Sequence, residues 1–491
     1  MSGPSSKLTW NSKQGSTLSP QQVEKIDVAL ANFFFGCNIP FNVVEAQLFK
    51  EFVQCLNPTY KPPSRKKLST KLLDKVYTEI NEDLKTADET DGVLVIYGWK
   101  NSAANTKNVV CTIHKQDQTS LFLHSWDFSE LRETGDKLAL VICDASAMAR
   151  EMFNINIYAV VSDNAAAMVR MGRLVDVWHV TCNSHSGNLL LKSLVSPDFA
   201  ESLNQLLREF RTSKAERELK KRGGTRIMLV CETRWCTFRD TFRCCLKNLN
   251  IMRQLVQEGI VLLKENNRKL LEDSTLAAQL QDAIILFDPV CQLINSCQAA
   301  DRNIADAVES WLKLNIPTSD DKVADMVNKR LEKVLQPIAL TANFLHPVYQ
   351  GKQFTHLELL KATVDEFLDE EMARRDLQQW EGLREYKEKT GIFKTIFDKQ
   401  ITSPKAFWCL AEGYYPTLSQ LAQRLLNIPS SSAQIERLFS NWAFIHSDLR
   451  NRLSIDHSRK LVSIYYALKM QDFSEDDKIS EKITVKGCSG N

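Results

Sequence analysis

The chain has 491 residues, 44% of them hydrophobic and 25% charged, which are the proportions of a soluble globular protein with two or three domains. Its net charge of +2 excludes a global field that would draw the protein onto nucleic acid or a membrane, so such binding must use local patches. No apolar run reaches the roughly 18–20 residues of a membrane span, and the first residues lack the apolar core of a secretory signal. The 13 cysteines are scattered without framework spacing, which favours reduced thiols and a location in the nucleus or otherwise the cytoplasm.

The N-terminal part of the chain is predicted to be helical after a short tail. Residues 1–18 are rich in Ser, Gly, Lys and Asn, a composition typical of disorder. Residues 19–90 carry helical apolar spacing, interrupted by a turn near Pro40 and by the basic loop KPPSRKK from Lys61 to Lys67. We therefore expect a disordered tail followed by an N-terminal helical region.

Residues 91–235 show a different periodicity, which predicts a sheet. Three short β-rich runs, GVLVIYGW, NVVCTIHK and SLFLHSW, are separated by polar turns, as in an antiparallel meander. A helix, the strand IYAVVSD, a second helix, the strand VWHVTC and a third helix follow. This β-β-β-α-β-α-β-α order predicts an α/β fold with a mixed sheet and helices on its faces.

The rest of the chain has almost no strand signal. Residues 236–404 contain long amphipathic segments and are expected to form a large all-helical insertion domain. Residues 405–471 are helical again and are expected to complete the core, and residues 472–491 form a polar tail.

The predicted strand order resembles the ribonuclease H fold, whose enzymes place three carboxylates around two divalent metal ions. Such ions must clamp the attacking and leaving oxygens of a phosphodiester, and hard cations require anionic oxygen ligands. Asp163 ends the predicted fourth strand, and Glu436 lies on a late helix. The first strand has Tyr97, directly before Gly-Trp, where an acid is expected.

Ordered motifs make the resemblance more specific. The chain contains, in this order, VVSDNAAAMVRMG, CNSHSGNLLL, ETRWCTF and SSSAQIERLFSNWAFIHSDLRNRLS, and it is similar to hAT superfamily transposases over nearly its whole length after about residue 20. The resemblance implies that Asp163 and Glu436 are the second and third catalytic acids and metal ligands. It also implies an Asp-Gly-Trp end to the first strand, from which Tyr97 departs. The BED-type zinc finger that begins many members is absent.

The loss of the first acid predicts an inactive catalytic core, because a phenol with a pKa near 10 is no anionic ligand at neutral pH. The expected function is that of a transposon-derived protein that associates with itself and with DNA or chromatin. The alternative is an active Mg²⁺- or Mn²⁺-dependent transposase with a replacement acid. Asp91 is too far along the strand for that role, at about 20 Å, and the sequence does not place Asp127. A decayed transposon copy is a third interpretation.

Two further motif elements have both a functional and a structural interpretation. Trp235 matches a family tryptophan thought to stack on flipped DNA bases, and a buried aromatic is the alternative. The basic segment from Arg211 to Arg226 suits a phosphate backbone, and a solvated loop is the alternative. The candidate DNA-binding residues are Trp235, Arg234, Lys220, Lys221, Arg222 and Arg226. Cys182 and His185 match a family Cys-x-x-His element, in which a packed thiol and a locally bonded imidazole are favoured over zinc ligands.

The C-terminal region is the predicted site of self-association. In the family, the segment equivalent to residues 405–470 supports dimerisation, and here one helix carries more apolar surface than one face can hide. The candidate dimerisation residues are Ile435, Leu438, Phe439, Trp442 and Phe444. We expect a homodimer or higher homo-oligomer with DNA as a candidate partner. No membrane, no small-molecule substrate and no cofactor beyond the conditional metal ions are expected.

Overall fold

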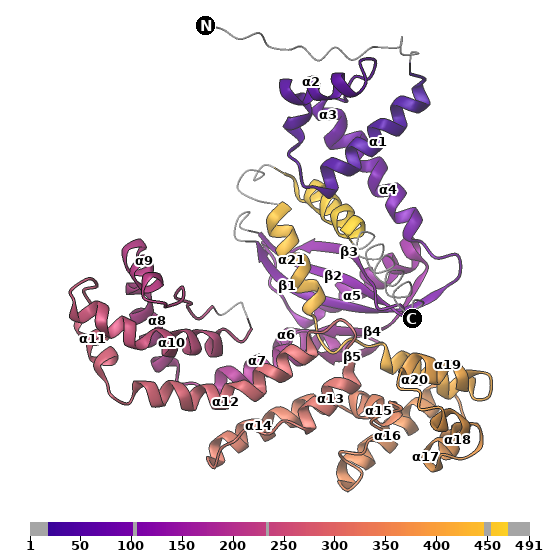
Figure 1. Cartoon of the computed structure of the whole chain (residues 1–491). Coiled ribbons are helices and arrows are strands. Elements are labelled where there is room, and N and C mark those ends of the chain that lie inside the picture. Colours follow the sequence, from indigo (N-terminus) through magenta and orange to yellow (C-terminus); the bar gives the residue numbers. More distant parts are fainter. Residues whose placement is uncertain (1–17, 102–105, 232–234, 446–452, 470–491) are drawn as a thin grey trace, which may run out of the picture.

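The computed structural model describes residues 18–101, 106–231, 235–445 and 453–469 of the chain (Figure 1). The polar tail expected over residues 472–491, and all but residue 18 of the tail expected over residues 1–18, lie outside these ranges. Within them, no helix has the length and apolar character needed to cross a bilayer.

One five-stranded mixed sheet lies at the centre of the molecule. Its strand order is β3-β2-β1-β4-β5: the first three strands are antiparallel, and β4 and β5 continue the sheet in parallel from β1. The strands are β1 (Thr90–Asn101), β2 (Thr106–Lys115), β3 (Ser120–Asp127), β4 (Ile155–Ser162) and β5 (Trp178–Thr181). The expected mixed α/β sheet is therefore confirmed.

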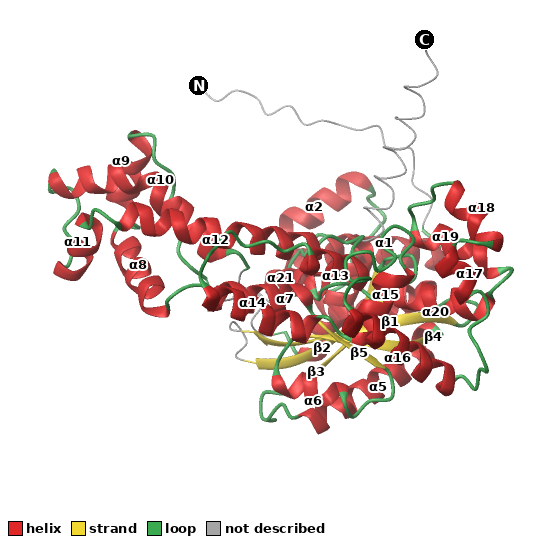
Figure 2. Ribbon diagram, turned by 90° about the horizontal axis from the view of Figure 1, so that it is seen from below, coloured by secondary structure: helices red, strands yellow, loops and turns green. Residues whose placement is uncertain are grey.

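Alternating side chains of β1 bury both faces of this sheet. Leu94 and Ile96 pack toward α5 (Gly135–Phe153) and α6 (Ala166–Gly172), whereas Val93 and Val95 belong to a larger core on the opposite face. Figure 2 shows α5 and α6 on one side of the sheet, with α13, α15 and α21 on the other. A strand buried on both faces reads as a continuous apolar run, which explains the sequence VLVI.

The N-terminal helices lie at one end of the sheet beside a C-terminal helix at residues 455–469 (Figure 1), and their buried residues join the core that covers one face of the sheet. Ser19 and Gln22 form a capping box that starts the first helix directly before Pro20. The Lys460 ammonium lies 2.7 Å from the Asp74 carboxylate and ties the two groups together. The N-terminal elements are α1 (Pro20–Gly36), the 3-10 helix η1 (Phe41–Glu45), α2 (Gln47–Leu56), α3 (Arg65–Lys67), the π-helical turn η2 (Leu68–Leu72) and α4 (Leu73–Leu84).

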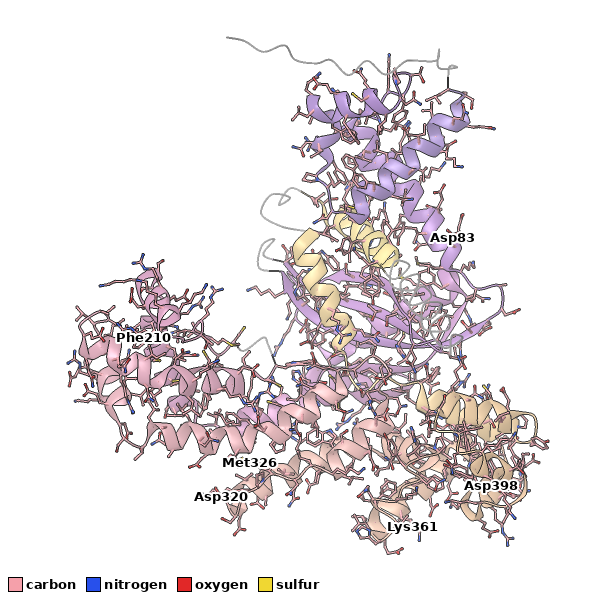
Figure 3. The ribbon with its side chains drawn as sticks, viewed as in Figure 1. Asp83, Phe210, Asp320, Met326, Lys361 and Asp398 are labelled. Atoms are coloured by element: carbon pink, nitrogen blue, oxygen red, sulfur yellow. The ribbon has the colours of Figure 1, made fainter. Side chains whose placement is uncertain are left out.

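The long helical part of the chain divides between two apolar cores. One core begins at Leu190, includes Phe210, which is labelled in Figure 3, and forms a lobe beside the sheet. The helices after residue 337 share the core that covers the sheet, so packing does not follow the expected boundaries at 235 and 404. This part contains α7 (Asn183–Ser193), α8 (Pro197–Glu209), α9 (Ser213–Lys221), α10 (Thr237–Gln257), α11 (Glu265–Glu272), α12 (Leu276–Cys297), α13 (Ile304–Leu312), α14 (Asp321–Val334), α15 (Pro337–Leu345), α16 (Glu358–Arg374), α17 (Leu383–Glu388), α18 (Gly391–Asp398) and α19 (Pro404–Glu412).

The last part of the chain returns to the sheet through α20 (Pro416–Leu426) and α21 (Ala433–Ile445). Arg424 of α20 donates two hydrogen bonds to Asp91 at the start of β1, at 2.6 and 2.9 Å. Between the two helices, the carbonyl of Ser430 accepts hydrogen bonds from the backbone and side-chain nitrogens of Asn183. These contacts fix α21 over the face of the sheet where β1 and β4 end.

Candidate functional site

The structure brings Tyr97, Asp163 and Glu436 together at one edge of the sheet. β1 and β4 are parallel neighbours in the register Val95↔Val161, so Tyr97, just past the last residue of β1 paired with β4, lies beside Asp163, which follows the end of β4. Tyr97 faces α21, where its ring centroid lies 5.5 Å from that of Phe439. Glu436 is one helical turn before Phe439 and therefore lies on the same face of α21.

Tyr97 is held as a neutral phenol at this edge. Burial first, and then the charges of Glu436 and Asp163, raise the pKa of Tyr97 well above its usual range. Its neighbour Trp99 stacks on Phe439 with centroids 5.2 Å apart, which packs this end of β1 against α21. The first-strand position thus supplies an aromatic contact and no negative charge.

Asp163 sits in the turn between β4 and α6. Its Oδ1 accepts a hydrogen bond from the backbone N–H of Ala165 at 2.8 Å, which organises the entry to the helix. Burial raises the pKa of Asp163, although this hydrogen bond and the nearby His185 oppose the shift. The Asp163 carboxyl group therefore both organises the entry to α6 and lies in the cluster formed with Tyr97 and Glu436.

Glu436 is the more strongly perturbed acid. Burial, and then the nearby charge of Asp163, raise the pKa of Glu436 to about 8. Its Oε1 is buried and has no hydrogen-bond partner among the described residues. Two carboxylates sharing a poorly solvated site cannot both ionise freely, so Glu436 is mainly protonated at neutral pH.

Cys182 and His185 form a helix start next to the acids. The Cys182 thiol caps α7 by accepting a hydrogen bond from the His185 N–H at 3.4 Å, and it accepts another from the Ser432 N–H at 3.3 Å. Burial raises the pKa of the Cys182 thiol and lowers the pKa of His185. Cys182 thus joins α7 to the segment before α21, and helps to hold Asp163 close to Glu436.

Neither replacement acid considered from the sequence is available. Asp91 is paired with Arg424, and Asp127 accepts hydrogen bonds from the backbone and hydroxyl of Ser129. Both carboxylates are therefore committed to structural contacts.

Sequence reasoning missed a third carboxylate, Glu133. Its Oε1 lies 2.9 Å from where a Cβ would stand on Gly98, and its charge raises the pKa of Asp163. Oε2 lies 3.1 Å from the Lys107 ammonium, whereas Oε1 is buried and has no hydrogen-bond partner in the part of the chain that the structure describes. Glu133 lies in the loop before α5 and belongs to no motif, so no sequence signal singles it out.

The donor set does not fit a two-ion centre. Within the described part of the chain, no three His, Cys, Asp or Glu side chains form a group able to hold a metal ion. Hard divalent cations require several anionic or carbonyl oxygens. The site supplies a neutral phenol, a mainly protonated Glu436, Asp163, and Glu133, one oxygen of which is paired with Lys107.

The candidate DNA-binding residues that the structure describes lie in the lobe built around α8 and α10. Trp235 is partly buried and packs against that core, and Arg234 lies outside the described residues. Acidic neighbours pair with four basic residues of the segment, whereas Lys214, Arg217 and Lys220 are exposed without an ion pair within the described ranges. The pairs are Lys221 with Glu218, Arg222 with Glu258, and both Arg211 and Arg226 with Glu216.

Four of the candidate dimerisation residues of α21 are buried. Ile435 and Leu438 are 0% exposed, Phe439 7% and Trp442 2%, and the side chain of Phe444 lies outside the described part. Trp442 donates a hydrogen bond to Ser458 of the C-terminal helix at 2.8 Å. The expectation of excess exposed apolar surface on α21 is therefore wrong, because the sheet and the C-terminal helix cover it.

One comparison with known proteins identifies part of the chain. Residues 383–468 match the model of the hAT family C-terminal dimerisation region, so this part of the chain is similar to that region, and the match supports homo-oligomerisation. The match begins at α17, earlier than the expected boundary at residue 405. No curated protein matches the chain significantly.

Proposed function

From the premise that the chain is hAT transposase-like and carries the family's dimerisation region, we propose that it is a transposon-derived, self-associating protein that does not cut DNA. Its mixed sheet, with α21 laid over the ends of β1 and β4, supports a ribonuclease H-like origin. We further propose that it acts in the nucleus in association with DNA or chromatin.

The observation that carries this proposal is Tyr97 beside Asp163 and Glu436. A phosphodiester-cleaving centre needs negative charge to hold two ions about 3.5–4 Å apart. Here the phenol stays neutral, and burial together with the charge of Asp163 raises the pKa of Glu436. Asp163 and Glu436 still lie beside the first-strand position, but Tyr97 does not supply there the negative charge that catalysis would need.

A nicking assay tests the loss of cutting. We expect the full-length protein, incubated with a supercoiled plasmid in Mg²⁺ or Mn²⁺, to leave the DNA intact. Tyr97→Asp restores the missing carboxylate, and any nicking it gains should disappear in Tyr97→Asp combined with Asp163→Asn. Nicking by the unmodified protein that Asp163→Asn abolishes would contradict the proposal.

The alternative function is that of an active metal-dependent enzyme, which would need a replacement acid. Glu133 is the candidate for that acid. Its unpartnered Oε1 and its proximity to Asp163 make it the replacement acid that such an enzyme would use. Lys107 neutralises its other oxygen, which weakens that role. The same nicking assay decides: Glu133→Gln must abolish activity in the unmodified background if this alternative holds.

DNA association is best supported by basic residues in the segment before α4, which runs from the loop at Lys61 through α3 and η2. Lys61, Arg65, Lys66 and Lys71 are exposed and, within the described residues, make no ion pair, unlike most of the segment from Arg211 to Arg226. Neutralising phosphates releases counterions, so binding should weaken with salt. In a fluorescence titration of duplex DNA, Lys61→Ala with Lys66→Ala should lower the salt slope by about 2. An unchanged slope would place DNA binding elsewhere.

A further inference from the structure

A cavity of about 350 Å³ lies between α16, α17 and the segment that joins α15 to α16. We call it the α16 pocket. Tyr97, Asp163 and Glu436 do not line it, so it is separate from the site at the edge of the sheet. Its volume falls at the lower end of the range for ligand pockets, about 300–1,000 Å³, which suits a single large side chain.

The floor of the α16 pocket is apolar. It consists of three buried side chains and the half-buried Phe344, and the buried ones are Phe354, Val364 and Tyr386. The hydroxyl of Tyr386 donates a hydrogen bond to the carbonyl of Phe344 at 3.0 Å, so it is already paired. A guest on this floor therefore gains free energy by burying apolar surface.

The rim of the α16 pocket is basic. Four exposed lysines line the cavity, and they are Lys352, Lys361, Lys387 and Lys389. Among the lining residues one acid, Asp365, pairs with Lys387 at 3.2 Å, and the other three lysines make no ion pair within the described ranges. Figure 3 labels Lys361 at the lower edge of the molecule. The mouth thus carries an excess of positive charge around an apolar floor.

We propose that the α16 pocket binds an acidic segment of a partner protein, with one aromatic side chain on the floor and carboxylates beside the lysines. An aromatic anchor in a pocket is the usual centre of such an interface. The lysines stand on three segments, namely the loop at Lys352, α16 at Lys361 and the end of α17. Acidic residues on both sides of the anchor would therefore face positive charge, which is electrostatic complementarity.

Two other ligand classes match the α16 pocket less well. A small anion would need cations gathered at one point, whereas these lysines are spread around the mouth. A nucleobase carries hydrogen-bonding groups on its edges, and burial without partners would cost it free energy. The four floor residues offer it no free side-chain partner, because the Tyr386 hydroxyl is taken.

A fluorescence anisotropy titration of the full-length protein tests this inference. The probe is a fluorescein-labelled peptide with a central tryptophan between three glutamates on each side. We expect saturable binding that weakens severalfold when NaCl rises from about 0.05 to about 0.5 M. A peptide with alanine in place of the tryptophan should bind about tenfold more weakly or worse, because it buries no ring.

Charge reversal on the protein tests the rim. Lys361→Glu combined with Lys389→Glu should weaken binding of the tryptophan peptide by about tenfold or more. Lys322→Glu with Lys329→Glu on α14 is the matched control, because these exposed lysines lie outside the pocket and the change in net charge is the same. The control should bind like the unmodified protein, and circular dichroism should show all variants folded.

The contradicting outcomes are equally specific. Equal affinity for the tryptophan and alanine peptides would remove the apolar anchor, and no saturable binding would remove the site. Displacement of the peptide by a thymidine oligonucleotide of equal charge as effectively as by unlabelled peptide would identify a nucleic-acid surface instead. The inference does not depend on the proposed loss of cutting, so the nicking assay can fail without changing these results.

Discussion

Protonation of Glu436 sets the electrostatics of the cluster at the edge of the sheet. In the unfolded chain this carboxyl ionises near its ordinary pKa of 4.5, whereas in the folded chain its pKa is about 8. Between these two values the folded state binds more protons than the unfolded state. The free energy of unfolding therefore falls as the pH rises from about 4.5 to about 8.

Replacing Glu436 with glutamine should remove this penalty. Glu436→Gln should match the unmodified protein near pH 4.5 and exceed its free energy of unfolding at pH 8 by on the order of 1–3 kcal/mol, after allowance for solvent screening. Urea denaturation at both pH values measures the difference. Glu388→Gln on the exposed face of α17 is the control. A Glu436→Gln effect that is equal at both pH values would rule out a raised pKa.

At this scale, sequence motifs could identify Asp163, Glu436 and the departure at Tyr97. They could not reveal Glu133, which reaches the site from a loop with no periodicity or motif. Nor could they show that Glu258 neutralises Arg222, because this ion pair spans two helices whose packing the sequence does not specify.

Helix α21 is an internal element, and its apolar stripe belongs to the fold. Trp442 packs edge-on to Phe122 of β3 with centroids 5.8 Å apart and hydrogen-bonds Ser458. A 3.6-residue period correctly predicts an apolar face but does not say whether the sheet or another chain covers it. The burial of this stripe could be assigned only once the C-terminal helix was placed.

Truncating Trp442 should therefore destabilise the single chain. Trp442→Ala removes a buried ring and a buried hydrogen bond, and should lower the free energy of unfolding by about 3–5 kcal/mol. The loss should not vary with protein concentration, as thermal unfolding at two concentrations will show. If Trp442→Ala has a normal melting temperature but a weakened dimer, Trp442 lies in the dimer interface instead.

At the scale of the whole molecule, the alternation of strand and helix patterns was enough to predict the mixed sheet. Residues VLVI of β1 and AVV of β4 are buried, as continuous apolar runs indicate. The division of the helical part was not predictable. Leu190 lies N-terminal to the expected boundary at residue 235 yet belongs to the lobe core, because helix packing depends on contacts between distant segments.

The central claim also concerns the whole molecule. We propose that the chain keeps the architecture of a metal-dependent site but has lost the ability to bind the metal ions. Calorimetric titration of Mn²⁺ into the full-length protein tests this most directly, with Asp163→Asn and Tyr97→Asp measured in parallel. We predict that the unmodified protein and Asp163→Asn bind Mn²⁺ indistinguishably, and that Tyr97→Asp gains a saturable site. Saturable binding by the unmodified protein that disappears in Asp163→Asn would contradict the account.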